Sequence, residues 1–256
     1  MERTAIRRRL TARMSWQIAT VTDVRRETGT ARTIVLDVPD WQGHLAGQHL
    51  DVRLTAEDGY RASRSYSVAS AWDGSHGSTI ELTVEQVPGG EVSPYLVDVL
   101  KVGDPLEIRG PVGGWFVWTP EQEGPVQLIG GGSGVVPLRA MLQAHAVAGT
   151  TPARLLYSVR RPESVIYVSD LKDLAASDNV DVRLVYTREA PAGEPRVGRI
   201  DAELIEQYAF KPEDGATTYV CGPTPFVETV ANLLVAAGHD PARVRTERFG
   251  PTGGPR

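Results

Sequence analysis

Arg64-Ser65-Tyr66-Ser67-Val68-Ala69-Ser70 is the stretch from which the fold of this chain can be worked out. It carries a cation, an aromatic ring and several hydroxyl groups at fixed offsets. In a β-strand, alternation would send Arg64 and Tyr66 to one face and Ser65 and Ser67 to the other. Such a strand suits a planar anionic cofactor, because a cation can pair with a diphosphate, a ring can stack and a hydroxyl can reach a ring nitrogen. Taken alone, the run is more often an ordinary edge strand, so its neighbours decide its meaning.

Length and composition describe a globular protein with room for two domains. The chain has 256 residues, of which 41% are hydrophobic and 23% charged, as in soluble proteins. Its net charge of −5 argues against a nucleic-acid partner, which needs a basic surface. No apolar run is long enough to span a bilayer, so we expect a cytoplasmic protein without a membrane span.

The N-terminal segment and the cysteine count exclude two further kinds of feature. Residues 1–13 are basic, but no apolar segment follows Arg13. We therefore expect a solvated, flexible tail over residues 1–15 and not a signal peptide. Cys221 is the single cysteine, which excludes a disulfide within the chain and an iron–sulfur cluster held by four of its own thiolates.

The first half of the chain predicts a small barrel. Short apolar runs separated by turn residues predict six strands: Ile18–Val24, Thr33–Val38, His49–Leu54, Tyr66–Ser70, Thr79–Val87 and Pro105–Arg109. One helix is predicted at Ser93–Leu100, with Ser93 as its N-cap and Pro94 at its first position. Six short strands with one helical insert favour a closed antiparallel β-barrel.

After Pro120–Pro125 the pattern changes to strands alternating with helices. Strands are predicted at Val126–Ile129, Ala153–Val159, Val180–Thr187, Thr217–Cys221 and Val244–Phe249, and helices at Leu138–Ala148, Asp170–Ala176, Ile200–Tyr208 and Pro225–Ala237. This alternation predicts a doubly wound parallel α/β sheet with ligands at the carboxyl ends of its strands. We therefore predict two domains, a barrel over residues 16–120 and an α/β domain over residues 121–256.

Two glycine-rich segments lie directly before predicted helices, where backbone N–H groups can bind phosphate. The first is Gly89-Gly90-Glu91-Val92-Ser93, which on its own residues fits a plain loop and cap better than a phosphate site. The second, Gly130-Gly131-Gly132-Ser133-Gly134-Val135-Val136-Pro137, joins a predicted strand to a predicted helix. Pro137 stands where the third glycine of the fingerprint Gly-x-Gly-x-x-Gly would be, so the generic match is weak.

Together these motifs resemble, in kind and in order, those of the ferredoxin–NADP reductase family. The resemblance runs from about Trp16 to Phe249 and rests on its Arg-x-Tyr-Ser, Gly-Gly-x-x-Ser, Gly-Gly-x-Gly-x-x-Pro and Cys-Gly-Pro elements. Gly110-Pro111-Val112-Gly113 is similar to the family's turn that closes the barrel. The resemblance implies a barrel that binds FAD, with FMN as the alternative, and an α/β domain that binds NADPH or NADH.

The resemblance also implies which residues contact each cofactor. The implied flavin contacts are Arg64, Ser65, Tyr66, Ser67, Ser70, Gly89, Gly90, Val92 and Ser93. The implied contacts of the nicotinamide nucleotide are Gly131, Gly132, Ser133, Gly134, Pro137, Cys221, Gly222 and Pro223. Arg64 and the first glycine loop would hold the flavin pyrophosphate.

Three residues, Ser67, Cys221 and Glu247, are expected to act at the hydride-transfer site through roles that the resemblance implies. Ser67 would hydrogen-bond near flavin N5. Cys221 would lie beside the nicotinamide as a contact and not as a nucleophile, because the flavin carries the redox chemistry. Glu247 would lie close to the flavin ring and Phe249 would cover its face. Seven residues follow Phe249, whereas plant-type chains end at their aromatic residue, so a Phe packed in the core is the alternative.

The choice between NADPH and NADH rests on the ends of two predicted strands. NADH usually meets a carboxylate at its ribose 2′-hydroxyl, whereas the 2′-phosphate of NADPH needs cations. Ser158 and Arg160 end one strand without an acid until Glu163, and Arg188 ends the next. Together they would bind a 2′-phosphate by charge-assisted hydrogen bonds, the alternative being solvated loop residues without a role. The sequence favours NADPH.

The sequence does not identify the electron acceptor. Members of the family that relay electrons internally carry an iron–sulfur domain, and this sequence has neither the length nor the cysteines for one. We therefore expect an external acceptor: a ferredoxin, an oxygenase or a molybdenum enzyme. Two alternatives stay open, a reductase of free flavin and a non-catalytic subunit that keeps the fold to bind nucleotide.

Overall fold

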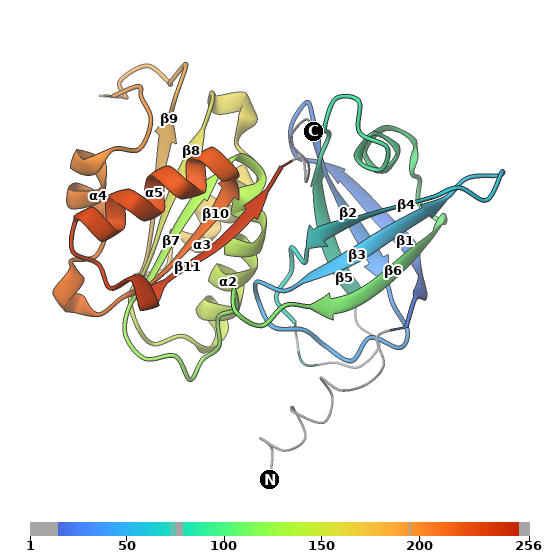
Figure 1. Ribbon diagram of the computed structural model, residues 1–256, viewed down its shortest axis with the longest axis horizontal. Coiled ribbons are helices and arrows are strands. Elements are labelled where there is room, and N and C mark those ends of the chain that lie inside the picture. Colours follow the sequence, from blue (N-terminus) through green and yellow to red (C-terminus); the bar gives the residue numbers. More distant parts are fainter. Residues whose placement is uncertain (1–14, 73, 75–78, 195, 251–256) are drawn as a thin grey trace, which may run out of the picture.

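The computed structural model describes residues 15–72, 74, 79–194 and 196–250, so most of the expected N-terminal tail lies outside the described residues. Figure 1 shows two units side by side, an antiparallel barrel and a parallel sheet with helices on both faces. The predicted fold class is therefore confirmed. No helix in the described part of the chain is long and apolar enough to cross a membrane.

The barrel has six antiparallel strands in the order β4-β3-β6-β1-β2-β5. They are β1 (Gln17–Arg26), β2 (Ala31–Asp37), β3 (His49–Thr55), β4 (Arg61–Ser67), β5 (Thr79–Glu85) and β6 (Pro105–Val112). A bridge between Val68, directly after β4, and Leu82 of β5 closes the sheet on itself. Alternate residues such as Leu50, Val52 and Ile80 are fully buried and fill the interior.

Most predicted strand bounds in the barrel differ by one or two residues at an end, and two predictions differ more. The fourth strand was expected at Tyr66–Ser70, but β4 begins at Arg61, where it pairs with Thr55 of β3 across the turn that contains Gly59. The apolar residues after β4 leave the strand because they pack inside the molecule: Val68 in the barrel core and Ala69 in the neighbouring core. The segment Gly110-Pro111-Val112, expected as a turn, continues β6 up to Val112.

The predicted helix between β5 and β6 is present and begins at Ser93 as expected, but Ser93 does not cap it. A helical turn begins at Ser93 and continues as a π-helix over Tyr95–Val99 without a side-chain cap. Ser93 is not an N-cap, because its Oγ accepts a hydrogen bond from the backbone N of Val87 at 3.0 Å and so ties the helix to the preceding loop. At the other end, Arg32 of β2 donates to the carbonyls of Val97 and Leu100 at 3.0 and 2.9 Å.

The second unit is a five-stranded parallel sheet in the order β11-β10-β7-β8-β9. Its strands are β7 (Val126–Gly131), β8 (Ala153–Val159), β9 (Val180–Tyr186), β10 (Thr217–Pro223) and β11 (Val244–Phe249), and its helices are α2 (Val135–Ala148), α3 (Val168–Leu174), α4 (Ala202–Tyr208) and α5 (Thr224–Ala236). Leu128 of β7 shares one core with α2 and α3, and Ile129 shares another with α4 and α5. Helices therefore cover both faces, as in a doubly wound fold.

The two units are joined by a continuous core. Ala31, Ala46 and Ala69 of the barrel side belong to the same buried cluster as α2, as do Phe116 and Trp118 of the connecting segment. This shared packing holds the end of β4 against the start of α2 and the end of β11. Where one domain ends and the next begins, near residue 120, stays a prediction.

Candidate functional site

The Arg-x-Tyr-Ser motif lies on β4, where the barrel faces the parallel sheet. Tyr66 is paired with Leu50 of β3 and packs partly against the barrel core. This burial raises the pKa of the Tyr66 hydroxyl to about 12. Ser65 is paired with Asp51, and its Oγ donates to Asp51 Oδ1 at 2.7 Å. The ring and the hydroxyl thus belong to opposite faces of the strand.

Arg64 is held by a carboxylate from the first glycine loop. Its Nη2 lies 3.1 Å from Glu91 Oε2, and Tyr60 donates to the other carboxylate oxygen at 2.8 Å. The side chains of Arg64 and Glu91 are 54% and 49% exposed, and such surface pairs contribute about 0–1 kcal/mol. A diphosphate can therefore replace Glu91 at the guanidinium without a large loss.

The loop that carries Glu91 is open on its outer side. Gly89 has φ +74°, a conformation that favours glycine, and a Cβ added there would meet nothing within 4 Å. Val92 and Ser93 are buried and fix the base of the loop. An exposed arginine fork, an uncapped helix start and an open glycine turn fit the diphosphate of a flavin dinucleotide.

The second glycine loop is closely packed. β7 passes through a 3₁₀ turn over Gly132–Gly134 into α2, whose first turn has neither a side-chain cap nor an acidic residue. Its N-terminal N–H groups and helix dipole therefore suit a phosphate. A Cβ on Gly131 would stand 2.8 Å from the ring of Phe226, and one on Gly134 would overlap the carbonyl oxygen of Cys221. Ser133 is half-buried, and Pro137 is buried within α2.

Cys221 ends the apolar part of β10 beside this loop. It is paired with Gly130 of β7 on one side and with Glu247 of β11 on the other. The thiol is fully buried, and burial together with the charge of Glu247 raises its pKa well above the ordinary value. A thiol that stays protonated is a poor nucleophile. The surroundings favour a packing role for Cys221, followed by Gly222 and the exposed Pro223 at the strand end.

A hydrogen bond crosses between the two units at this point. Ser67 Oγ donates to Glu247 Oε1 at 3.2 Å, although 180 residues separate them in the chain. Burial raises the pKa of Glu247 to about 7, against the opposing effect of this hydrogen bond. Ser67, Glu247 and Cys221, the three residues expected to act at the hydride-transfer site, therefore lie together. Phe249 is half-buried and packs partly against the core of the parallel unit.

The three residues expected to choose the nucleotide lie at neighbouring strand ends. The backbone N–H groups of Arg188 and Glu189 donate to the carbonyl of Arg160 at 3.0 and 3.2 Å. Both arginines are exposed, and neither forms an ion pair with another residue that the structure describes. Ser158 is only 7% exposed and is paired with Gly131, the start of the glycine loop.

One expected flavin contact is occupied by the protein itself. Ser70 Oγ accepts a hydrogen bond from the backbone N of Glu81 at 3.1 Å, in the interface between the units. Glu81 in turn binds Arg139 of α2, a buried arginine that the sequence analysis missed. Its signal was available, because a charge stands between Leu138 and Ala140 on an otherwise apolar helix segment. No group of three or more His, Cys, Asp and Glu side chains within the described ranges could hold a metal ion.

Comparisons with known proteins give two family matches that follow the two units. Residues 18–117 match the family described as oxidoreductase FAD-binding domain, and residues 128–232 match the oxidoreductase NAD-binding domain. The first match contains the motif on β4 and the open glycine loop. The second contains the packed glycine loop and Cys221.

Curated relatives are longer than this chain. It is 30% identical over 242 residues to the ferredoxin reductase component of 3-ketosteroid-9-alpha-monooxygenase from Rhodococcus rhodochrous, covering 93% of this chain and 66% of that protein. It is 31% identical over 239 residues to the glycine betaine monooxygenase reductase subunit of Pseudomonas aeruginosa, covering 90% and 63%. The chain thus spans about two thirds of the length of these relatives, or less.

Solved structures match over nearly the whole chain. The FAD/NAD-binding domain of a nitric oxide dioxygenase from Vibrio cholerae has a TM-score of 0.83 at 28% identity, covering 93% of this chain and all of that one (100%). The cytochrome P450 reductase GcoB from Amycolatopsis has a TM-score of 0.81 at 27% identity, covering 95% and 72%.

Proposed function

The chain belongs to the ferredoxin–NADP reductase family of FAD- and NAD-binding oxidoreductases, and we propose that it transfers electrons from a nicotinamide nucleotide through FAD to an external acceptor. The observation that carries the proposal is the junction of Ser67, Glu247 and Cys221, which lies between the two cofactor-binding units. Bound FAD would supply the redox chemistry, by accepting a hydride and releasing electrons to the acceptor. The chain's own residues would bind and orient the two cofactors and exclude water from them.

The barrel residues would hold and orient the flavin. Arg64 and the loop of Gly89 and Gly90, which is open at Gly89, would bind the diphosphate once Glu91 releases the guanidinium. Tyr66, whose hydroxyl keeps its proton, offers its ring for stacking. These roles are supported by the positions of the residues, since Arg64 and Tyr66 lie on β4 and the two glycines lie on the loop whose Glu91 binds Arg64.

The parallel sheet would hold the nucleotide. The uncapped start of α2 would bind its pyrophosphate, and the close approach of Gly134 to the backbone of Cys221 shapes the surface for the nicotinamide. Arg160 and Arg188 are exposed cations at adjoining strand ends, which supports NADPH as the preferred donor.

Glu247 would hold a proton beside the reacting groups. Its pKa of about 7 leaves the carboxyl part protonated and part ionised at neutral pH. Ser67 fixes one oxygen of the Glu247 carboxyl group. The proton is therefore held at a defined place next to β4, the strand that carries the Arg-x-Tyr-Ser motif and is called the flavin strand below.

An oxygenase is the proposed destination of the electrons. Two relatives are named as reductase parts of monooxygenases, and another as the electron transfer component of toluate 1,2-dioxygenase. The single cysteine means that the next redox centre is not an iron–sulfur cluster ligated by four cysteines of these 256 residues.

The test is anaerobic stopped-flow reduction of the purified, FAD-loaded chain. We expect NADPH to bleach the flavin absorbance at 450 nm within seconds, and the reduced protein to pass electrons to a [2Fe–2S] ferredoxin used as probe. A flavin that neither NADPH nor NADH reduces would refute the reductase assignment. Loss of FAD on gel filtration, combined with turnover of added free flavin, would show a free-flavin reductase instead.

The nucleotide preference has its own test. Arg160→Ala combined with Arg188→Ala should raise the KM for NADPH at least tenfold and leave the KM for NADH nearly unchanged, because a charge-assisted hydrogen bond contributes about 1.5–3 kcal/mol. Arg161→Ala, which removes the exposed arginine next to Arg160, is the matched control and should change neither. A wild type that prefers NADH would end the NADPH assignment.

A further inference from the structure

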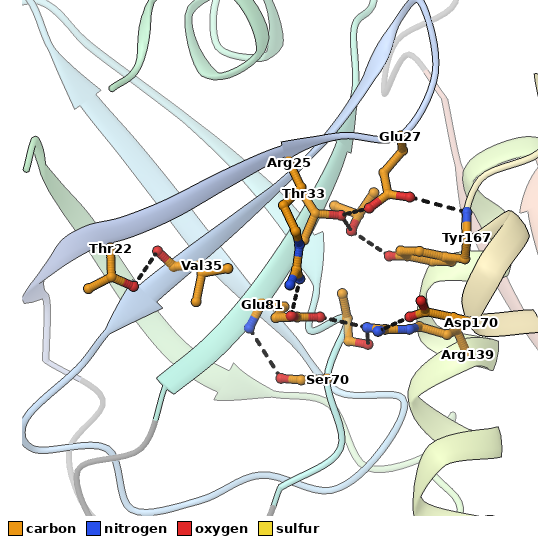
Figure 2. Close-up of polar contacts among 12 residues, drawn as sticks. Thr22, Arg25, Glu27, Thr33, Val35, Ser70, Glu81, Arg139, Tyr167 and Asp170 are labelled. Carbon is orange, nitrogen blue, oxygen red and sulfur yellow. Dashed lines mark hydrogen bonds and ion pairs between the residues drawn. The ribbon is translucent and has the colours of Figure 1, made fainter. Parts of the chain in front are cut away.

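Arg139 connects the barrel directly to the helix of the second glycine loop. It lies on α2, two residues after Pro137, and is only 6% exposed. Its Nη1 donates to the carbonyl of Ala69 at 3.0 Å and to Glu81 Oε2 at 2.6 Å, and its Nη2 pairs with Asp170 of α3. Figure 2 shows this guanidinium between the strands of the barrel and the helices of the parallel unit.

The barrel partners of Arg139 are continuous with the flavin strand. Ala69 follows Ser67 by two residues, and its backbone N donates to the carbonyl of Glu81 at 2.7 Å. Ser70 Oγ accepts from the backbone N of the same glutamate at 3.1 Å. A shift of Arg139 would therefore move the segment after β4 together with β5.

The charges around Arg139 are balanced. Glu81 also pairs with Arg25 of β1, so two carboxylates and two guanidinium groups meet in the network. Burial alone would raise the pKa of Glu81, but its bonds to Arg139 and Arg25 lower it below the ordinary value. The pair of Glu81 with Arg139 is buried, at 16% and 7% exposure, so removing Arg139 is costly, whereas Arg25 is 47% exposed and its pair with Glu81 contributes little.

Arg139 also contacts the ring of Tyr167, next to its bonds with Glu81 and Asp170. The guanidinium of Arg139 lies 4.6 Å from the ring centroid of Tyr167, whose hydroxyl donates to Thr83 of β5. The backbone N of Tyr167 donates to Glu27 Oε2 at 3.2 Å. These contacts attach α3 to the barrel, whereas α2, the helix that begins at the second glycine loop, is attached by the bonds of Arg139 and by a hydrogen bond from the backbone N of Ala71 to Gln143 Oε1 at 3.2 Å.

We infer that Arg139 is a positioning residue whose guanidinium fork fixes the flavin strand β4 relative to helix α2, and thereby sets the rate of hydride transfer. The inference rests on the proposed function, because the two elements are those proposed to hold the two cofactors. Misplacement of reacting groups by about 1 Å can lower a rate about 100-fold. Removal of the fork should therefore affect the rate of flavin reduction far more than the binding of either cofactor.

The kinetic test compares three variants by single-turnover reduction with NADPH and with NADH. Arg139→Met, similar in length but without donors, should lower the limiting rate of flavin reduction by about 100-fold at unchanged FAD content and with less than threefold change in nucleotide Kd. Arg139→Lys keeps one charge without the fork and should give an intermediate rate. Arg25→Met is the matched control. It removes the other arginine that pairs with Glu81, but Arg25 belongs to the barrel itself and its side chain is 47% exposed. It should stay within twofold of the wild type.

The structural test does not depend on turnover. The native cysteine is buried, so spin labels can be placed at Val102→Cys in the barrel unit and Val235→Cys on α5, both at exposed positions. The distance distribution between the labels should be narrow in the parent protein and in Arg25→Met, and broad or shifted in Arg139→Met. If Arg139→Met does not fold, Arg139→Lys decides both tests.

The outcomes separate the inference from the proposed function. A wild-type rate of reduction, or an unchanged distance distribution, in the deciding Arg139 variant overturns the inference while the reductase assignment stands. If the wild-type flavin is reduced by neither nucleotide, the proposed function fails, and the label distances alone decide whether Arg139 holds the two units together.

Discussion

The two glycine loops of this chain differ in what surrounds them. A Cβ on Gly89 would extend into open space, whereas one on Gly134 would overlap the backbone of Cys221. The helices that follow both loops lack a side-chain cap, but the first loop is also accompanied by an exposed arginine, Arg64. The barrel site thus relies on charge around an open turn, and the site on the parallel sheet relies on backbone groups brought close together.

This difference predicts how each site fails. In the barrel, a substitution should weaken cofactor binding while the fold survives, because little is packed against the loop. In the parallel sheet, a substitution should damage packing first, because the loop meets the backbone of β10 and the ring of Phe226 on α5 at close distance.

The largest effect is expected for Gly134→Ala. Its new methyl group has to displace the Cys221 backbone, and overpacking costs about 1–3 kcal/mol, with a direct overlap of backbone atoms at the upper end of that range. Urea denaturation should show the loss, together with loss of nucleotide binding by the folded fraction. Gly114→Ala is the control, since a Cβ there meets nothing within 4 Å. Equal stability of the two variants would show that the second loop is not tightly packed.

The next effect concerns Glu247, where both sites meet. Its pKa is about 7 in the folded protein against about 4.5 for an ordinary glutamate, so the folded state binds a proton that the unfolded state has released. Stability should therefore fall as pH rises from about 4.5 to about 7, by about 3 kcal/mol for this group. Glu247→Gln does not titrate and should lack this part of the decline.

The measurement is the free energy of unfolding of both apoproteins at pH 5 and pH 8. Other groups titrate equally in the two proteins, so the difference between the profiles isolates Glu247. Parallel profiles would mean that the carboxyl is solvated and that Ser67 does not hold it in a buried junction.

A smaller effect is expected for Arg64→Ala, which tests the role of charge in the barrel site. Loss of one charge-assisted contact of about 1.5–3 kcal/mol should weaken FAD binding about 10- to 100-fold without lowering the melting temperature of the apoprotein. Arg61→Ala, three residues earlier on β4 and also exposed, is the control. FAD titration followed by fluorescence decides between them, and equal affinities would remove Arg64 from the site.

Much of this architecture could be predicted from the sequence because its signals are local. The strands Ala153–Val159 and Val244–Phe249 were predicted with the observed bounds. The order of the strands in the parallel sheet follows from doubly wound topology. The flavin strand was misplaced because Val68 and Ala69 look like strand residues but are buried by two different cores.

What the sequence could not predict are contacts between distant segments. Glu91 at Arg64, Glu247 at Ser67 and the pairs of Arg139 join residues 27 to 180 positions apart. Each side chain, taken alone, resembles a solvated charge or hydroxyl. For Glu247 and Arg139 the difference is burial, which depends on how the two units pack; for the exposed Arg64 and Glu91 it is the position of the first glycine loop beside β4.

The smallest effect, and the finest test of the contrast between the loops, is expected for Gly89→Ala. Its φ of +74° strains an alanine by about 1 kcal/mol, although a Cβ has free space. Gly59→Ala is a matched control, because Gly59 has φ +85° and equally free space in the turn before β4. Both variants should lose about 1 kcal/mol of stability, since the strain is the same. Only Gly89→Ala should also weaken FAD binding, by a few-fold, because relief of the strain moves the loop that faces Arg64. Equal FAD affinities in the two variants would mean that the glycine serves the turn alone and that Arg64 binds the diphosphate without help from the loop.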